Sequence, residues 1–301
     1  MRVLILGGSG FVGTALTKKL CELNEEVTVF DKREPSFSGV NVKIGYFDNP
    51  DALNDVLQGE YDTIYHLISE TFPSVQQPEL DIGSVVLPTL RVLKHTVKNR
   101  TKLVFVSSGG TVYGSRINPL FPVSEEFPLN PRCSYGIGKV TIENYIRMYA
   151  VLNELDYTVL RFSNIYGPNS SNKGLQGFIG TALHNIKHDL PVKIWGTEKI
   201  PKDYLDINDA ITALVHGARV CGTYNVGSGV GLSTHDLLPI FKAITEKEVK
   251  IEYAEKSPLD VGFILDCSKF KKTGWKNKVT IHEGVEKIFY LLVLLLLLSV
   301  H

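Results

Sequence analysis

Short apolar runs recur along the first half of the chain, each bounded by glycine or polar residues. Six of these runs are rich in β-branched and aromatic residues, which predicts strands at 2–6, 26–30, 42–46, 63–68, 102–108 and 157–162. Stretches with helical periodicity lie between the strands, at 13–23, 51–58, 85–99 and 139–155. This alternation predicts right-handed βαβ crossovers and an α/β fold with a doubly wound parallel sheet. Ligands of such a fold bind at the carboxyl ends of the strands.

The pattern changes after about residue 165, where long polar loops at 166–177 and 196–204 separate shorter regular elements. We therefore expect residues 1–165 to form a domain around the sheet, and residues 166–301 to form mainly a smaller C-terminal lobe. Two later segments are expected to return to the sheet, 204–218 as a helix and 222–228 as an extra strand.

The end of the chain contains an unbroken apolar run at residues 288–298. A helix of this length spans about 16 Å, roughly half of the hydrocarbon core of a bilayer, so we expect no transmembrane span. Three alternatives stay open: a helix buried in the fold or in a subunit interface, a peripheral membrane contact, and an abnormal terminus.

Charge and cysteine content narrow the possible partners and compartment. Lys and Arg together number 32, as do Asp and Glu, which leaves no net charge to attract nucleic acid or an acidic membrane. The four cysteines show no CxxC spacing, which argues against a zinc site or a disulfide framework and fits a reducing compartment. The chain opens with a strand at residue 2 and without a signal-peptide pattern. We expect a cytoplasmic protein that binds no metal.

A glycine-rich turn follows the first strand directly. In "GGSGFVG", Gly7, Gly10 and Gly13 flank Phe11 and Val12 at the opening of the first helix. Glycines at these points allow a tight turn, a close approach of backbone N–H groups to a pyrophosphate, and close packing of the helix on the sheet. A plain tight turn is the alternative, but the position at the first strand-to-helix junction favours a dinucleotide site.

Two carboxylates follow the next two strands. Asp31 lies at the end of the second strand, 24 residues after Gly7, where a carboxylate accepts hydrogen bonds from the adenosine ribose and repels a 2′-phosphate. It favours NAD over NADP, although Lys32 and Arg33 follow at once and leave NADP open. Asp48 is a candidate to contact the adenine amino group; alternatively, it starts a turn before a proline.

Tyr135 and Lys139 lie four residues apart at the start of a predicted helix, and so on one face of it. A phenol with a pKa of about 10 is a poor base at neutral pH, but a neighbouring ammonium stabilises its phenolate. Such a pair can move the proton that accompanies hydride transfer at an alcohol. Taken alone, the pair is more typical of a surface helix; the glycine-rich turn and a hydroxyl-rich strand end favour the catalytic interpretation.

Together these motifs resemble the extended short-chain dehydrogenases/reductases, specifically the NAD-dependent epimerase/dehydratase family that acts on nucleotide sugars. The matching segments are "GGSGFVG", Asp31, "YHLIS" with Leu67, "SSGGTVYG", "YGIGK", "RFSNIYGP", "KDYLDINDA" and "NVGSG", between residue 7 and about residue 229. The resemblance implies that residues 1–165, with the returning segments near 204–228, form a Rossmann domain that binds NAD, and that the later lobe binds the sugar nucleotide.

The resemblance also implies residue roles. Tyr135 is the acid/base group, Lys139 also holds the nicotinamide ribose, and Asn164 lines the nicotinamide and substrate site. Lys202 and Tyr204 lie in the substrate segment, where many relatives carry an arginine at the lysine position. A second phosphate-binding arginine is replaced by Ser257, with Lys256 beside it. The segment 85–91 also lacks the two asparagines that usually mark this helix in the family.

The strand end "FVSSGGTVYG" departs from the family in an informative way. The catalytic hydroxyl of related epimerases and dehydratases corresponds to Gly109. We therefore expect Ser108 to bind the sugar oxygen, with Thr111 as second choice. Ser107 is expected to satisfy backbone groups at the strand end.

The function that the resemblance implies is hydride chemistry at C4 of a nucleotide-activated hexose. In a 4-epimerase, Tyr135 takes the 4-hydroxyl proton while NAD takes the C4 hydride, and hydride returns to the other face of the sugar. A 4-keto-6-deoxyhexose reductase is the alternative; a dehydratase is less expected, because Gly110 and Thr111 replace its acidic pair, and a non-catalytic NAD-binding protein is the remaining alternative. Family members commonly pair through two long helices, here 84–98 and 139–155, so a homodimer is expected.

Overall fold

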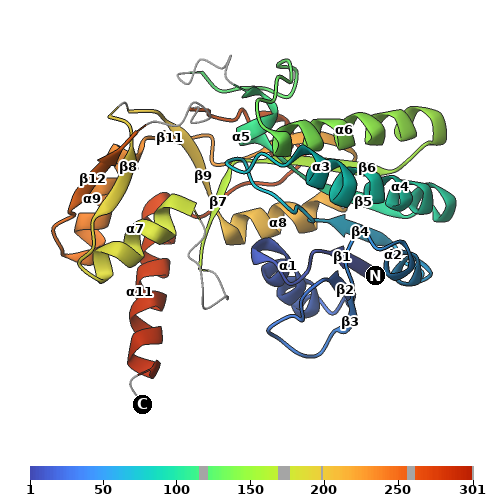
Figure 1. The fold of residues 1–301 in the computed structure, drawn as a ribbon, viewed down its shortest axis with the longest axis horizontal. Coiled ribbons are helices and arrows are strands. Elements are labelled where there is room, and N and C mark those ends of the chain that lie inside the picture. The colour runs from blue at the N-terminus through green and yellow to red at the C-terminus, as the bar shows by residue number, and fades with distance from the viewer. Residues whose placement is uncertain (115–120, 169–176, 198, 256–261, 300–301) are drawn as a thin grey trace.

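A computed structural model of the chain describes residues 1–114, 121–168, 177–197, 199–255 and 262–299, with side chains through residue 294 (Figure 1). Its main sheet has seven parallel strands in the order β10-β6-β5-β4-β1-β2-β3. The strands are β1 (Arg2–Leu6), β2 (Glu26–Asp31), β3 (Asn41–Ile44), β4 (Thr63–His66), β5 (Lys102–Ser108), β6 (Tyr157–Phe162) and β10 (Gly222–Val226). The predicted doubly wound sheet is confirmed, although β3 and β4 each end two residues earlier than expected.

Helices cover both faces of this sheet. The longer ones are α1 (Phe11–Glu22), α2 (Pro50–Leu57), α4 (Leu87–Asn99), α6 (Ser134–Asn153) and α8 (Ile207–Gly217). Shorter turns are α3 (Pro78–Asp81), the π-helical η1 (Ile82–Val86), α5 (Gly109–Val112) and α10 (Ser268–Lys271). In β1, Val3 and Ile5 pack into the core beneath α1 and α8. Leu4 and Leu6 pack into the core beneath α2, α4 and α6, because alternate side chains of a strand point to opposite faces.

Two helices begin differently from their prediction. The helix expected from residue 85 is preceded by η1, and Pro88 stands at the second position of α4. Proline has no N–H to donate to the carbonyl of Ser84, and this lost bond favours the wider π turn. The helix expected from residue 139 begins earlier, at Ser134, because the Cys133 sulfur accepts a hydrogen bond from the Gly136 N–H at 3.4 Å.

A smaller lobe lies at one side of the sheet domain (Figure 1). Its strands are β7 (Asn164–Tyr166), β8 (Val192–Trp195), β9 (Lys202–Asp206), β11 (Gly231–Leu232) and β12 (Ile251–Ala254), and its helices are α7 (Gly177–Lys187), α9 (Thr234–Thr245) and α11 (Ile281–Ser299). The segment predicted as a helix from residue 204 instead begins as β9. The carboxylate of Asp206 then caps α8 by accepting the Asn208 N–H at 2.8 Å. The segment near 222 joins the main sheet as β10 beside β6.

The C-terminal helix α11 is only partly packed. Val285 and Ile288 are buried in the lobe core, where α11 meets α7 and α9. Tyr290 and Leu294 are 63% and 51% exposed, and the helix extends away from the body of the molecule (Figure 1). Among the described side chains of the apolar run that begins at residue 288, Ile288 is buried, whereas Tyr290, Leu291 and Leu294 are exposed. Of the helices in the described part of the chain, none is long and apolar enough to cross a membrane.

Candidate active site

The glycine-rich turn joins β1 to α1 at the carboxyl end of the sheet. Gly7 has φ +91°, a conformation that glycine adopts readily, and its N–H donates to the Phe30 carbonyl at 2.8 Å. A Cβ on Gly13 would lie 2.1 Å from the Gly7 carbonyl oxygen, so only glycine fits there. Gly10, which precedes α1, offers no side chain to cap the helix. The first N–H groups of α1 therefore suit an anion.

Asp31 holds this turn against the end of β2. The residue is buried, and its carboxylate accepts hydrogen bonds from the Ser9 N–H at 3.0 Å and the Arg33 N–H at 3.1 Å. The Ser9 hydroxyl donates in turn to the Arg33 carbonyl at 2.8 Å. Two loops are thus tied together by a carboxylate that also faces the cavity described next.

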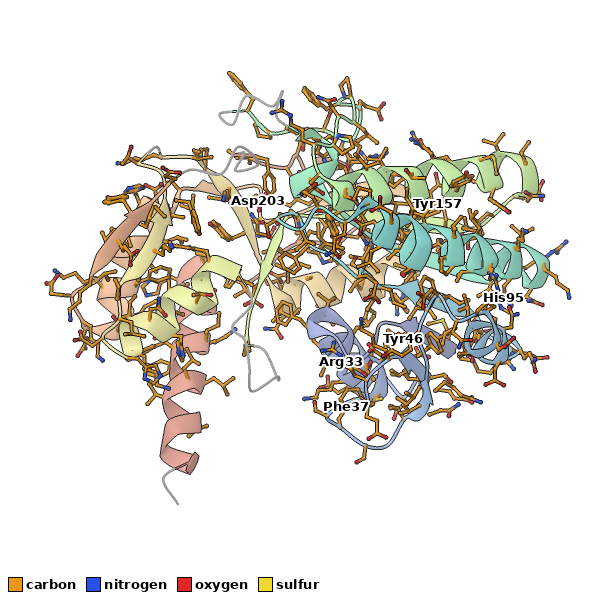
Figure 2. All side chains as sticks on the ribbon, in the orientation of Figure 1. Arg33, Phe37, Tyr46, His95, Tyr157 and Asp203 are labelled. Atoms are coloured by element: carbon orange, nitrogen blue, oxygen red, sulfur yellow. The ribbon has the colours of Figure 1, made fainter. Side chains whose placement is uncertain are left out.

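A cavity of about 110 Å³ opens between the loops that follow β1, β2 and β4. Its lining residues are Gly7, Gly10, Asp31, Lys32, Arg33, Gly45, Phe47, Leu67, Ile68, Ser69 and Glu70. Four of the expected cofactor residues, Gly7, Gly10, Asp31 and Leu67, therefore face one space; Arg33, labelled in Figure 2, lies near α1. A backbone cradle next to a ribose-binding carboxylate fits the pyrophosphate and adenosine of NAD.

The remaining expected cofactor residues lie beside this cavity. Phe11, Val12 and Gly13 form the first turn of α1. Asp48 is exposed, lies in a turn in which the Asn49 N–H donates to the Tyr46 carbonyl, and accepts the Ser84 hydroxyl at 2.8 Å. Gly45 and Phe47 line the cavity in this segment, so Asp48 as an adenine contact stays a prediction.

Tyr135 and Lys139 project from the first turns of α6 toward the ends of β4 and β5. The Lys139 ammonium is buried, donates to the Val106 carbonyl at 2.9 Å, and lies 4.9 Å from the ring centroid of Phe105 and 5.5 Å from that of Tyr135. Burial lowers the pKa of Lys139 to about 7, while the charges of Glu143 and Asp81 oppose the shift.

Burial also has the largest effect on the pKa of the Tyr135 phenol. It raises the pKa of Tyr135 to about 12, and hydrogen bonding with the side chains of Ser108 and Ser69 opposes this shift. The net shift is opposite to the one expected from a neighbouring ammonium, because burial outweighs the interactions that favour the phenolate. Catalysis at neutral pH therefore needs further stabilisation of the phenolate when ligands bind.

The two candidate hydroxyls of the strand end differ in their contacts. Ser108 ends β5 and its side chain interacts with Tyr135. The Thr111 hydroxyl donates to the Ser108 carbonyl at 3.5 Å, within the short helix α5. This geometry favours Ser108 as the partner of the phenol. Ser69, which sequence reasoning missed, contacts the phenol from the end of β4 and also lines the cofactor cavity, so it links the two parts of the site.

The absence of side chains at Gly109 and Gly110 has a packing reason. A Cβ on Gly109 would lie 2.6 Å from Leu265 Cδ1, and one on Gly110 would lie 2.9 Å from the Phe263 ring. The side chains of Leu265 and Phe263 are buried, and both belong to a segment that packs across the end of the strand. The position where relatives carry a hydroxyl is therefore filled here by an apolar side chain from another part of the chain.

Ser107 was expected to bind backbone groups, and this detail is wrong. Its hydroxyl donates to the buried carboxylate of Glu143 at 2.6 Å. The same carboxylate forms an ion pair with Arg161 at 2.6 Å, and Arg161 also donates to the Tyr113 hydroxyl at 2.9 Å. This buried network lies behind the strand end and supports it, so Ser107 still has a structural role.

Asn164 and Asp203 lie where the two lobes meet, as the label of Asp203 in Figure 2 shows. The Asn164 amide donates to the Asp203 carbonyl at 3.1 Å, which links β7 to β9. The buried Asp203 carboxylate accepts the N–H groups of Ser228 at 2.8 Å, Gly229 at 3.0 Å and Leu265 at 3.3 Å. Asp203 lies in one of the segments that resemble the family, but the sequence did not predict that its carboxylate binds these backbone groups.

A second cavity, of about 440 Å³, lies within the smaller lobe. Its lining residues come from α7, β8, β9 and the start of α9: Gly177, Phe178, Thr181, Ala182, Asn185, Val192, Lys193, Trp195, Ile200, Lys202, Tyr204 and Thr234. Lys202 and Tyr204 thus share one space, as the substrate assignment requires. Trp195, which sequence reasoning missed, is 52% exposed and has the Lys193 ammonium 4.9 Å from its ring centroid. The expected phosphate contacts Lys256 and Ser257 lie outside the described residues.

Comparison with known proteins agrees with this arrangement. Residues 3–227 match the family model described as the NAD dependent epimerase/dehydratase family. A UDP-glucose 4-epimerase of Mycolicibacterium smegmatis is 30% identical over 95% of this chain and 97% of its own. A dTDP-4-dehydro-6-deoxyglucose reductase of Escherichia coli is 29% identical over 95% and 96%. The crystal structure of a Thermotoga maritima UDP-glucose 4-epimerase with UDP-glucose has a TM-score of 0.90 and 27% identity, over 98% of this chain and 100% of that one.

Proposed function

Because the chain belongs to the NAD dependent epimerase/dehydratase family, we propose that it is a nucleotide-sugar 4-epimerase, which performs NAD-dependent hydride chemistry at C4 of a nucleotide-activated hexose. One observation carries the proposal. The Tyr135 phenol interacts with Ser108 and with Ser69, and Ser69 also lines the cavity that suits NAD. Tyr135, the proposed acid/base group, thus lies next to the cavity proposed for NAD, the hydride acceptor.

The chain supplies the groups that bind and orient the cofactor. The backbone of the turn from Gly7 to Gly10 would hold the pyrophosphate, Asp31 the adenosine ribose, and Lys139 the nicotinamide ribose. When bound, NAD accepts the C4 hydride and later returns it. A phenolate at Tyr135 would be stabilised by positive charge in the site, which bound NAD would supply, and this would offset the effect of burial on the pKa of Tyr135.

Proton movement falls to Tyr135 and Ser108. Ser108 donates or accepts a hydrogen bond at the sugar 4-oxygen, while Tyr135 takes the proton of that hydroxyl as the C–H bond breaks. The resulting 4-keto sugar then turns over in the site. Tyr135 returns the proton as the hydride adds to the opposite face of C4. The cofactor is regenerated within the cycle, so no external reductant is consumed.

The cavity of the smaller lobe is proposed to hold the nucleotide part of the substrate. The exposed face of Trp195 suits stacking on a base, and Lys202 with Lys193 brings positive charge to the diphosphate. The M. smegmatis and T. maritima relatives act on, or are bound to, UDP-glucose, which makes a UDP-hexose the first substrate class to test.

A reductase of nucleotide-4-keto-6-deoxyhexoses is the second candidate. It is favoured by the similarity to the E. coli reductase, which is nearly as identical to this chain as the epimerase. The same Tyr135 would then donate a proton while reduced cofactor is consumed and exchanged. A dehydratase is disfavoured by the same strand end, because Gly110 and Thr111 provide no acidic pair.

A homodimer in the cytoplasm completes the proposal. Large apolar side chains are exposed on or next to α4 and α6: Leu87, Ile137, Met148, Val151 and Leu152. Their burial against a second copy would form a helical interface. All four cysteines are free, which supports a reducing compartment. Light scattering coupled to gel filtration tests the dimer, which a monomer at micromolar concentration would contradict.

Purification followed by nucleotide analysis tests the proposed function. The protein is desalted, heat-denatured, and its released nucleotide identified by chromatography. It is then incubated with UDP-, dTDP- and GDP-hexoses without added cofactor. Retained NAD and formation of the C4 epimer of one sugar support the epimerase. A protein that arrives empty and oxidises NADH or NADPH only with a 4-keto sugar supports the reductase, and one that binds no nucleotide contradicts both.

A further inference from the structure

An ion pair bridges the cofactor cavity at the side where Asp31 lies. The Lys32 ammonium is 2.5 Å from the Glu70 carboxylate, and both residues line the cavity together with Asp31. Lys32 directly follows β2, whereas Glu70 comes from the loop after β4. The contact therefore joins the carboxyl ends of two strands that are not adjacent in the sheet.

The cations at this side of the cavity are held by carboxylates. The Arg33 guanidinium lies 3.9 Å from the Asp31 carboxylate, and Lys32 is paired with Glu70. The four side chains thus comprise two positive and two negative groups and carry no net charge at neutral pH. A 2′-phosphate placed here would meet one carboxylate from each strand end, and the Lys32 ammonium is already paired with Glu70.

We propose that Glu70 is a determinant of cofactor choice, because it holds Lys32 in an ion pair and adds a second negative charge beside Asp31. This inference rests on the proposed function. Asp31 alone leaves the choice open, since the lysine and arginine that follow it could bind a 2′-phosphate. Because Glu70 pairs with Lys32, the lysine is less available to bind a 2′-phosphate. NAD presents a neutral 2′-hydroxyl where NADP carries a phosphate, so the pair favours NAD over NADP.

The expected effect is moderate because the pair is partly exposed. The side chains of Lys32 and Glu70 are 40% and 19% exposed, so water and salt screen their charges. An ion pair of this kind changes binding by about fivefold when one partner is lost. Glu70→Gln keeps the size of the side chain and frees the Lys32 ammonium, so it should raise NADP binding relative to NAD binding by about that factor.

The test measures which nucleotide the protein retains. Wild-type protein, Glu70→Gln, and the double variant Glu70→Gln/Lys32→Met are each incubated with excess NAD and NADP in equal amounts until the bound nucleotide no longer changes. The protein is then desalted, and the released nucleotides are quantified by chromatography. Glu60→Gln is the matched control, because Glu60 pairs with Arg2 at 2.6 Å at the opposite end of the strands.

The expected result is a bound NADP-to-NAD ratio about fivefold above wild type for Glu70→Gln, and near the wild-type value for the double variant and the control. The rise should shrink at high salt. An unchanged ratio in Glu70→Gln, with NAD still retained, would overturn the inference and leave the proposed function standing. A wild-type protein that retains neither nucleotide would instead overturn the proposed function and the inference with it.

Discussion

The two cavities of the molecule are built in different ways. The residues that line the cofactor cavity lie between positions 7 and 70. Each lies at the end of one of four neighbouring strands of the main sheet, β1 to β4, or in the segment that follows it. Asp31 supports this cavity through N–H groups of its own loop and of the loop after β1. The proposed substrate cavity, in the smaller lobe, is lined by residues between 177 and 234. Asp203 lies between two of these residues in β9 and bonds to residues 25, 26 and 62 positions away. The first cavity is built by loops at one edge of a single sheet, whereas the lobe that holds the second is also joined by a contact across 62 positions, between Leu265 and Asp203.

This difference predicts that each cavity can be impaired without loss of the other. Tyr135→Phe removes the group that exchanges the proton and leaves both cavities intact. Turnover should fall by about 1000-fold, within the range for loss of a general acid/base. The readout is the rate of C4 epimer formation together with retained NAD. Loss of NAD along with activity would show that the residue acts through cofactor binding.

The strand end next to Tyr135 gives the next largest effect. Ser108→Ala removes a hydroxyl that interacts with the phenol, and turnover should fall by about 100-fold with NAD still bound. Thr111→Val is the matched control, because the Thr111 hydroxyl bonds to the backbone carbonyl of Ser108. It should change turnover by less than about threefold. A large loss only in Thr111→Val would reverse the assignment of the two hydroxyls.

The buried lysine of the sheet domain predicts a pH dependence of stability. Burial lowers the pKa of Lys139 from 10.5 to about 7. Between these values the unfolded chain binds a proton that the folded chain has lost, so this residue's contribution to the free energy of unfolding rises with pH. Below about pH 7 both states hold the proton and the cost of burial is fully present.

Lys139→Met removes this titration and supplies the comparison. In nucleotide-free protein, the stability advantage of the variant over wild type should shrink by about 2 kcal/mol from pH 7 to pH 9, as measured by urea denaturation. The constant cost of leaving the Val106 carbonyl without its donor does not affect this slope. Parallel curves for the two proteins would show that Lys139 keeps an ordinary pKa.

The smallest effect on catalysis is expected for a substitution in the substrate cavity. Trp195→Ala removes an aromatic face that lines it, and KM for the sugar nucleotide should rise by about 10-fold, the value of one lost base stack. The amount of retained NAD should not change, because Trp195 lies in the other lobe. A lower NAD content would contradict the independence of the two cavities. Tyr253→Ala is a matched control, since Tyr253 is exposed to the same 52% on the neighbouring strand β12.

The same difference explains what the sequence could predict. The sequence could predict the main sheet and three residues of the cofactor cavity, Gly7, Gly10 and Asp31. Strand periodicity and a turn at a strand-to-helix junction are local signals that can be recognised in the sequence. The packing of Leu265 over Gly109 was not predictable, since it joins positions more than 150 residues apart. Ser69 was missed for a related reason: a lone serine after a strand gives no sign that it meets a phenol from another helix.

Isotope retention tests the central claim most directly. The sugar nucleotide that the protein converts is supplied with deuterium at C4, without added cofactor, and the product is examined by mass spectrometry and NMR. The account predicts a C4-epimeric product that keeps deuterium at C4, with NAD still bound. A product whose C4 hydrogen comes from solvent, or a conversion that begins only after reduced cofactor is added, would contradict it.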